Sequence, residues 1–309
     1  MVRYLDLRKS MESMKIAVTG GAGFIGHNLV WRLLAAGHEV YVIDNFSTGN
    51  IQMLLRDGNL PKGLTIYECD IVHSVFPVLE LDAMVHLAAP VSVPESLEDP
   101  EKYRTGILVG SKRCFDWAKQ SGAKHIVAAS TAAVYGDTDE MPISEEADTD
   151  PMSPYALYKL EMESLLADYN SNSLNCTILR FFNVFGEGQR ATGGYVSAVP
   201  IFLNQYNSYL PITVTGDGQQ TRDFIYVGDV CNAIMLGLEQ EWQPDLPIYN
   251  VGFGIERKIY DLAECLGGEI KFIAERNEPK RSLSDISNIK SELGWNPEMD
   301  VLSWLTKQK

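Results

Sequence analysis

Short apolar runs alternate with longer helix-like stretches through the first half of this 309-residue chain. The helix-like stretches cover residues 25–36, 101–120 and 154–169, whereas the apolar runs are short enough to be buried strands. Strands that alternate with helices are typical of parallel βαβ units. Two later apolar runs, 177–182 and 248–251, predict strands that return to the same sheet. The predicted strands of the first half span residues 15–19, 39–43, 65–68, 83–87 and 125–129.

The second half of the chain loses this alternation. Residues 183–222 and 253–309 hold many turn residues, so we expect them to form a smaller lobe. Residues 14–182, together with about 223–252, then form the domain that contains the sheet. Residues 1–13 precede the first predicted strand and are expected to be an extension.

Composition restricts the classes of protein that fit. The chain is 45% hydrophobic and 22% charged, which is ordinary for a globular protein. No apolar run approaches the ~20 residues of a membrane-spanning helix, and the N-terminal residues lack the apolar stretch of a secretory signal. A net charge of −15 without a Lys/Arg run argues against a nucleic-acid partner. The five cysteines are scattered without metal-ligand spacing, so we expect reduced thiols in a cytoplasmic protein, with no metal and no membrane partner.

A glycine-rich turn follows the first predicted strand and leads into the first predicted helix. Its key positions are Gly20, Gly23 and Gly26. Glycine permits the tight turn and lets backbone N–H groups approach a pyrophosphate at the helix N-terminus. The next strand leads to Asp44, whose carboxylate would accept hydrogen bonds from ribose hydroxyls and repel a 2′-phosphate. This order of elements predicts an NAD site on a Rossmann-type, doubly wound parallel α/β sheet. The smaller α/β lobe is then expected to bind the substrate.

A later helix carries a tyrosine and a lysine one turn apart. Ser153 is expected to cap this helix, with Pro154 at its first position. Tyr155 and Lys159 project from one face, whereas Tyr158 points elsewhere and is expected to pack. A tyrosine has an ordinary pKa of about 10, and lowering it by ~3 units costs roughly 4 kcal/mol. An adjacent ammonium and an oxidised nicotinamide can supply that energy, so the pair predicts an acid–base site.

Polar side chains also stand where predicted strands end. Ligands of doubly wound sheets bind at the carboxyl ends of the strands. Of the two hydroxyls after the strand that precedes the Tyr155 helix, Ser130 is expected to cap the strand and Thr131 to belong to the site. Asp70 follows an earlier strand, and either contacts the adenine or caps that strand end.

Together these motifs resemble the extended short-chain dehydrogenase/reductase family, specifically its NAD-dependent epimerase/dehydratase branch. The resemblance runs from about Lys15 to Pro297, and includes His86-Leu-Ala-Ala, Leu-Arg-Phe-Phe-Asn-Val-Phe-Gly186 and Gly-Asp-Gly-Gln-Gln-Thr-Arg-Asp-Phe224. It implies catalytic roles for Thr131, Tyr155 and Lys159, and a nucleotide diphosphate held by Asn183 and Arg222. It also implies a homodimer that packs through residues 101–120 and 154–169. The residues that it assigns to NAD are Gly20, Gly23, Phe24, Ile25, Gly26, Asp44, Asn45, Asp70, Ile71, Leu87, Ala88, Ala89, Tyr155 and Lys159.

The chain departs from the family pattern in two places. The family has an asparagine near the start of the helix before the catalytic strand, and residues 105–110 contain none. The family also has an arginine before a Gly-Glu pair, and here Arg276 lies one position out of register. Arg276 is therefore either a substrate contact or a surface charge. Ser282 matches a position that lines the sugar pocket of relatives, where a small residue leaves room for an N-acetyl group; the alternative is an ordinary turn serine.

The residues after Thr131 separate the reactions of this family. By this resemblance, dehydrating relatives have a Thr-Asp-Glu pattern at these positions, and decarboxylating relatives carry a glutamate nearby. Here the two residues are Ala132 and Ala133, whose side chains cannot transfer a proton. The sequence therefore predicts NAD-dependent epimerisation at C4 of a nucleotide sugar through a transient 4-keto intermediate. The expected substrates are UDP-glucose and UDP-galactose or their N-acetyl forms. The alternatives are another nucleotide-sugar enzyme of the family (a dehydratase, decarboxylase or reductase) and a non-catalytic NAD sensor.

Overall fold

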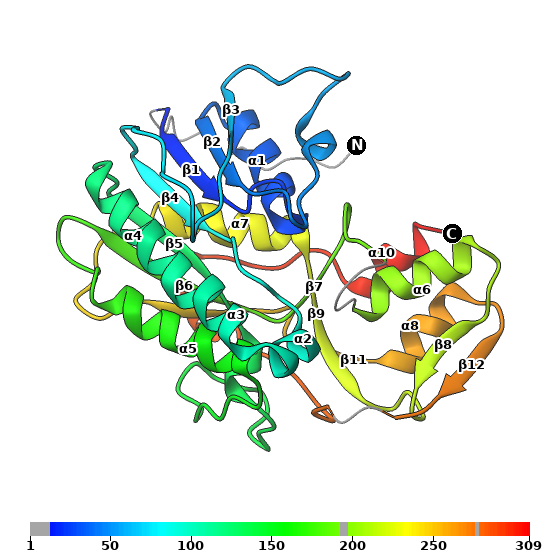
Figure 1. Cartoon of the computed structure of the whole chain (residues 1–309). Coiled ribbons are helices and arrows are strands. Elements are labelled where there is room, and N and C mark those ends of the chain that lie inside the picture. The colour runs from blue at the N-terminus through cyan, green and yellow to red at the C-terminus, as the bar shows by residue number, and fades with distance from the viewer. Residues whose placement is uncertain (1–12, 192–196, 276–277) are drawn as a thin grey trace.

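A parallel sheet forms the centre of the larger domain (Figure 1). The computed structural model describes residues 13–191, 197–275 and 278–309. Within these residues the sheet has seven strands in the order β10-β6-β5-β4-β1-β2-β3, and all neighbouring strands are parallel. The strand order changes direction between β1 and β4, so the expected doubly wound α/β fold is confirmed. The strands are β1 (Lys15–Thr19), β2 (Glu39–Asp44), β3 (Leu64–Glu68), β4 (Ala83–His86), β5 (His125–Thr131), β6 (Asn175–Phe181) and β10 (Ile248–Val251).

Helices cover both faces of this sheet. Successive residues of a strand point to opposite faces, so each strand contributes to two cores. On one face, Ile16 and Val18 of β1 share a core with α1 (Phe24–Ala35) and α7 (Val227–Leu238). On the other face, Ala17 shares a core with α4 (Gly110–Gln120) and α5 (Pro154–Ala167). Burial of both faces explains why the strands read as continuous apolar runs in the sequence.

The helix predicted over residues 101–120 is not regular throughout. It consists of α3 (Pro100–Arg104), a π-helical segment η2 (Thr105–Val109) and α4. Gly106 of η2 packs against the ring of Pro90, and an added Cβ would lie 3.0 Å from two of its carbons. The π-helical segment η2 thus lies where the helix contacts Pro90, in the loop after β4. The apolar periodicity of the sequence does not reveal this contact. The remaining short helices of the sheet domain are η1 (Ile51–Leu54), α2 (Val93–Glu98) and η3 (Ala132–Tyr135).

The smaller lobe lies beside the sheet domain (Figure 1). It has a hydrophobic core of its own. Phe185, Phe202 and Phe224 belong to that core, together with apolar residues from the helices of the lobe. One sheet, β11-β9-β7, extends from the larger domain into the lobe, and a second sheet pairs β12 with β8. These elements are β7 (Asn183–Phe185), α6 (Ala198–Asn207), β8 (Ile212–Thr215), β9 (Thr221–Tyr226), β11 (Glu256–Lys258), α8 (Ile259–Leu266), β12 (Ile270–Ile273) and α10 (Val301–Thr306).

Residues 253–309, which the sequence analysis places together in the lobe, divide between the two cores. Ile286, Ile289 and Trp295 belong to the core that contains α1 and α7. Trp295 also donates a hydrogen bond from its indole N–H to the carbonyl oxygen of Asp229 in α7 at 2.9 Å. The segment around α9 (Ser287–Leu293) therefore packs on the sheet domain, and the chain then returns to the lobe in α10.

Among the described residues, no helix has both the length and the apolar character needed to cross a membrane.

Candidate active site

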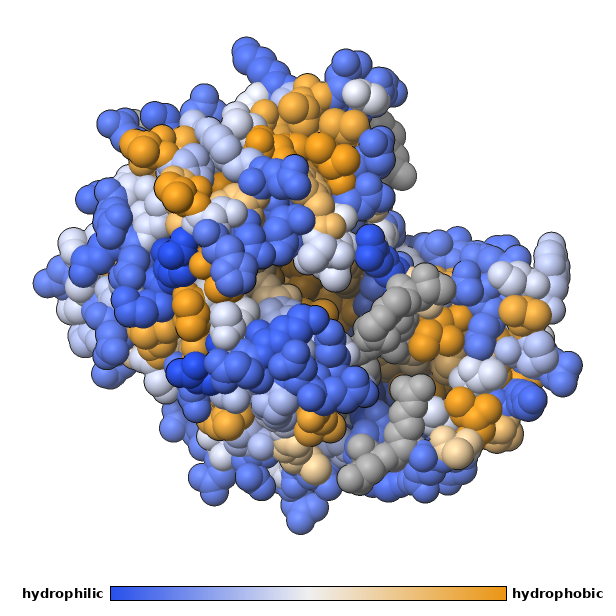
Figure 2. Space-filling model, in the orientation of Figure 1, coloured by the Kyte–Doolittle hydropathy of each residue, from blue (hydrophilic) through white to orange (hydrophobic). Residues whose placement is uncertain are grey.

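The residues predicted to bind a dinucleotide gather at one edge of the sheet. Gly20 follows β1, Asp44 ends β2, Asp70 follows β3, and residues 87–89 follow β4. Because these strands are parallel, their carboxyl ends meet at the same edge. Thr131, the last residue of β5, lies at this edge as well. Figure 2 shows the surface hollowed between the sheet domain and the smaller lobe.

The glycine turn is packed too tightly for side chains. Gly20 has a φ of +71°, and an added Cβ would lie 2.9 Å from the backbone nitrogen of Ala88. An added Cβ on Gly26 would lie 2.1 Å from the carbonyl oxygen of Gly20. Phe24 and Ile25 begin α1 after Gly23, and in the described structure no side chain caps this N-terminus. An uncapped helix N-terminus behind a glycine turn is a suitable cradle for a pyrophosphate.

Asp44 connects the glycine turn to the second strand. Its buried carboxylate accepts hydrogen bonds from the backbone N–H groups of Ala22 at 2.9 Å and Phe46 at 2.8 Å. Each carboxylate oxygen has a further lone pair, so both can still accept bonds from ribose hydroxyls. The turn and this acid together fit an adenosine diphosphate of the kind found in NAD.

Asn45 and Asp70 lie side by side beyond Asp44. The Asn45 amide donates a hydrogen bond to Asp70 at 2.8 Å. Asp70 also accepts bonds from the N–H groups of Val72 at 2.8 Å and His73 at 3.0 Å. The sequence left two roles open for Asp70, contact with the adenine and capping of the strand end. In the structure its carboxylate caps the turn that begins at Asp70 and Ile71.

A buried histidine holds the turn formed by Leu87, Ala88 and Ala89. His86 Nδ1 lies 2.8 Å from Thr19 Oγ1, and His86 Nε2 lies 2.8 Å from Ser111 Oγ. Thr19 Oγ1 accepts from the N–H groups of Leu87 at 3.2 Å and Ala88 at 3.3 Å. Burial, reinforced by the charge of Lys159, lowers the pKa of His86 to about 3. His86 is therefore a neutral connector between β1, β4 and α4.

The Tyr155 helix begins as predicted, since Ser153 Oγ accepts the N–H of Ala156 at 3.2 Å and Pro154 follows. Lys159 is 4% exposed, and its Nζ donates to the carbonyl oxygen of Ala129 in β5 at 2.8 Å. Burial lowers the pKa of Lys159 to about 8, although the negative charge of Glu163 opposes this shift. The α5 helix is thereby fastened to β5 two residues before Thr131.

Three tyrosines lie around the start of α5 and share one apolar core. Tyr155 meets Tyr103 edge to face, with ring centroids 6.5 Å apart. The Tyr103 hydroxyl donates to Glu95 and accepts the N–H of Ser92, each at 2.9 Å. Tyr155 and Tyr158 are both partly buried against the apolar core on this side of the sheet, so the packing predicted for Tyr158 is confirmed and Tyr155 shares it.

The two hydroxyls at the end of β5 point to different partners. Thr131 Oγ1 accepts the N–H of Ala133 at 3.2 Å and starts η3. Ser130 is 4% exposed and donates to Glu163. Ser130 is therefore tied to α5 rather than capping the strand end.

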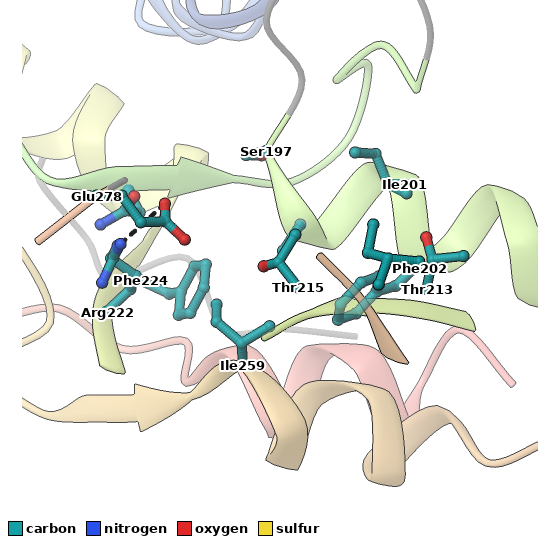
Figure 3. Close-up of a pocket in the computed structure, with 12 residues that line it drawn as sticks. Ser197, Ile201, Phe202, Thr213, Thr215, Arg222, Phe224, Ile259 and Glu278 are labelled. Carbon is teal, nitrogen blue, oxygen red and sulfur yellow. Dashed lines mark ion pairs between the residues drawn. The ribbon is translucent and has the colours of Figure 1, made fainter. Parts of the chain in front are cut away.

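A pocket in the smaller lobe begins close to the carboxyl end of β6, since Asn183 lines it. Figure 3 shows polar and apolar residues of its lining. Arg222 points into it and forms an ion pair with Glu278 at 3.0 Å. Asn183 also lines the pocket, and its amide donates to the carbonyl oxygen of Asp223 at 3.1 Å. The other lining residues are Ser197, Ala198, Ile201, Phe202, Thr213, Thr215, Phe224, Ile259 and Ile273.

The remaining substrate residues predicted from the sequence lie after β12. Ser282 is half-buried, and two residues before it the carbonyl oxygen of Lys280 accepts the N–H of Thr221, next to Arg222. Arg276 lies outside the described residues. Glu278 was not singled out from the sequence, because a glutamate in a charged run gives no sign that it will face an arginine from β9.

Known proteins resemble the chain over nearly its whole length. A putative UDP-glucose 4-epimerase from Methanocaldococcus jannaschii is 32% identical, covering 93% of this chain and 94% of that protein. UDP-glucuronic acid decarboxylase 1 from Xenopus tropicalis is 33% identical, covering 96% of this chain and 71% of that protein. The structure of a UDP-N-acetylglucosamine 4-epimerase from Methanobrevibacter ruminantium M1, in complex with UDP-N-acetylmuramic acid, superposes with a TM-score of 0.89 at 31% identity. It covers 96% of this chain and 97% of that chain.

The sequence model of the NAD dependent epimerase/dehydratase family matches residues 16–252, which include the glycine turn, Asp44, Thr131, Tyr155 and Lys159. The resemblance stated from the motifs is thus confirmed. The chain belongs to the NAD-dependent epimerase/dehydratase family, and its cofactor is NAD.

Proposed function

We propose that the protein catalyses epimerisation at C4 of a UDP-sugar. The observation that carries this proposal is the attachment of Lys159 to Ala129, which holds the Tyr155 helix beside Thr131 at the edge where the dinucleotide residues converge. Relatives named as UDP-sugar 4-epimerases support the choice of reaction. The absence of an acid at Ala132 and Ala133 supports it further, because the reaction needs proton transfer at O4 alone.

In this reaction each residue has a limited task. Tyr155 removes the proton from O4 of the sugar and later returns it. Thr131 donates a hydrogen bond to O4, and the Lys159 ammonium stabilises the tyrosinate and holds the nicotinamide ribose. NAD bound at the glycine turn and Asp44 would supply the hydride chemistry, namely oxidation at C4 and reduction of the 4-keto sugar from its opposite face. Inversion at C4 with no net redox change is the result.

We propose that the pocket beside Arg222 receives the nucleotide half of the substrate. A guanidinium can bind two phosphate oxygens at once, so a diphosphate would replace Glu278 as the partner of Arg222. Asn183, which also lines this pocket, would add an amide contact. The sheet domain would then hold NAD and the smaller lobe the sugar nucleotide.

The homodimer remains part of this proposal. Val109 and Leu157, on the two helical segments expected to pair with a second copy, are 39% and 40% exposed. Their burial in a dimer would remove apolar surface from water.

Product analysis tests the function directly. The protein is incubated separately with UDP-glucose, UDP-N-acetylglucosamine and UDP-glucuronic acid, and the products are separated by chromatography. We expect the C4 epimer of at least one of them, without consumption of added NAD(H) and without release of carbon dioxide. Release of carbon dioxide with formation of a UDP-pentose would instead make the protein a decarboxylase, like the Xenopus relative.

A substitution at Ser282 tests how the size of the sugar is sensed. If Ser282 leaves room for an acetamido group at C2, Ser282→Tyr should lower kcat/KM for the N-acetylated substrate by roughly 10-fold or more while sparing the unacetylated one. Both kcat/KM values are measured under the same conditions. Ser287→Tyr, on the exposed first turn of α9, is the matched control and should change neither value. Equal losses for both sugars would remove this role from Ser282.

A further inference from the structure

A buried ion pair lies directly behind the candidate catalytic residues. Arg180 Nη2 donates to Glu163 Oε2 at 2.7 Å, and Arg180 Nε donates to Glu163 Oε1 at 3.0 Å. The two side chains are only 5% and 4% exposed. Taking both charges out of water costs several kcal/mol, so such a pair is weak evidence for stability by itself. Its position therefore calls for another explanation.

The carboxylate of Glu163 joins three elements of the site. Glu163 lies one helical turn after Lys159 on α5, so both side chains are on the same face of the helix. Ser130, on β5, donates its hydroxyl hydrogen bond to the same carboxylate. Ser130 stands between Ala129, which accepts from Lys159, and Thr131. Glu163 thus ties the helix of Tyr155 and Lys159 to the end of β5 and, through Arg180, to β6.

Within the described part of the chain, Glu163 is the charged group that acts on Lys159. His86 of β4 is close enough for the charge of Lys159 to act on it, and it is neutral because burial holds its pKa low. Tyr155 lies one turn earlier on α5, and Arg180 of β6 is paired with Glu163. Burial opposes the charged form of Lys159, and Glu163 favours it. The glutamate is therefore the nearby group that keeps the ammonium charged.

We propose that Glu163 is a positioning residue for the reaction, an inference that rests on the function proposed above. Held by Arg180 and Ser130, its carboxylate fixes α5 against the end of β5. Its negative charge faces the Lys159 ammonium and keeps it in the form that the tyrosinate and the nicotinamide ribose require.

The test measures the titration of Lys159 itself. The full-length protein is labelled with ¹³C-lysine, the Lys159 signal is assigned from its loss in Lys159→Met, and its pH dependence is followed by NMR. In Glu163→Gln we expect the midpoint to move down by about 1 pH unit or more. A lysine with a lower pKa loses its proton at lower pH, so the alkaline limb of the kcat profile should move down with it. We expect kcat near pH 8 to fall by about 5-fold or more, because the protonated fraction of Lys159 drops from about a half to about a tenth.

Tyr135→Phe is the matched control. The Tyr135 hydroxyl accepts a hydrogen bond from Arg180 at 2.9 Å and donates one to Asn250 at 2.7 Å. Loss of this hydroxyl therefore disturbs the same buried network but leaves the negative charge of Glu163 in place. It should lower the melting temperature but leave the Lys159 midpoint and the pH profile unchanged. A midpoint that stays in place in Glu163→Gln, or moves equally in Tyr135→Phe, overturns the proposal.

Ser130→Ala provides a readout if Glu163→Gln does not fold, because it preserves the ion pair and removes the link to β5. It should lower kcat by about 3-fold or more with little change in the KM of the sugar nucleotide, and unchanged kcat would overturn the proposal. The NMR titration is independent of turnover. If the wild type shows no 4-epimerase activity but the midpoint shifts as expected, the proposed function fails and the positioning of Lys159 by Glu163 stands.

Discussion

Tyr155→Phe is expected to lower kcat for sugar epimerisation by between about 100-fold and 10,000-fold, the usual contribution of a positioned acid–base group. Phenylalanine keeps the aromatic ring that meets Tyr103 edge to face, so the packing at the start of α5 should survive. NAD binding should also persist, because the glycine turn and Asp44 lie on other elements. The comparison requires kcat, NAD affinity by calorimetry and the melting temperature of the same preparation.

Tyr158→Phe is the control for this substitution. Tyr158 lies on the same helix and packs against the apolar core, and removal of its hydroxyl should change kcat by less than about 2-fold. The mechanism would be wrong if Tyr155→Phe retained most of its activity, or if the two variants were impaired equally.

The sheet could be predicted from the sequence because its strands are buried on both faces. Ile16 and Val18 face one core and Ala17 the other, so the apolar run of β1 is continuous and easily recognised. Strand ends were less accurate: β5 continues to Thr131, two residues beyond the predicted end, because its backbone pairs with β6 as far as Phe181. A ladder partner far away in the sequence decides where a strand stops.

The sequence suggests candidate site residues where one element supplies them, whereas contacts that need several elements to meet could not be predicted. The spacing of Tyr155 and Lys159 follows from helix geometry alone, and Asp44 follows from its place after a strand. By contrast, the ion pair of Glu163 joins α5 to β6, and that of Arg222 joins β9 to the loop after β12. Each partner looks like an ordinary charged residue until the fold brings the other to it. The π-helical turn η2 was missed for the same reason, since its contact with Pro90 is tertiary.

Gly26→Ala is expected to weaken NAD binding by roughly 100-fold, about 2.8 kcal/mol, which is the scale of one or two hydrogen bonds to a charged group. The new Cβ would lie 2.1 Å from the carbonyl oxygen of Gly20 and 2.7 Å from the Cα of Gly21. Both contacts are with backbone, which cannot rotate away as a flexible side chain can. The N-terminus of α1 must therefore move relative to the turn, and the N–H groups that would meet the pyrophosphate move with it.

The rise in melting temperature on adding NAD measures this loss, because at a fixed NAD concentration the stabilisation of the folded state grows with the logarithm of the affinity. Gly237→Ala is the matched control, since Gly237 lies inside α7 on the same face of the sheet and its Cβ would approach only methyl groups, 3.3 Å from Val127 at the closest. That variant should respond to NAD like the wild type. If Gly26→Ala responded as strongly, α1 would be able to shift without disturbing the cofactor, and the close packing of Gly26 on Gly20 would serve stability alone.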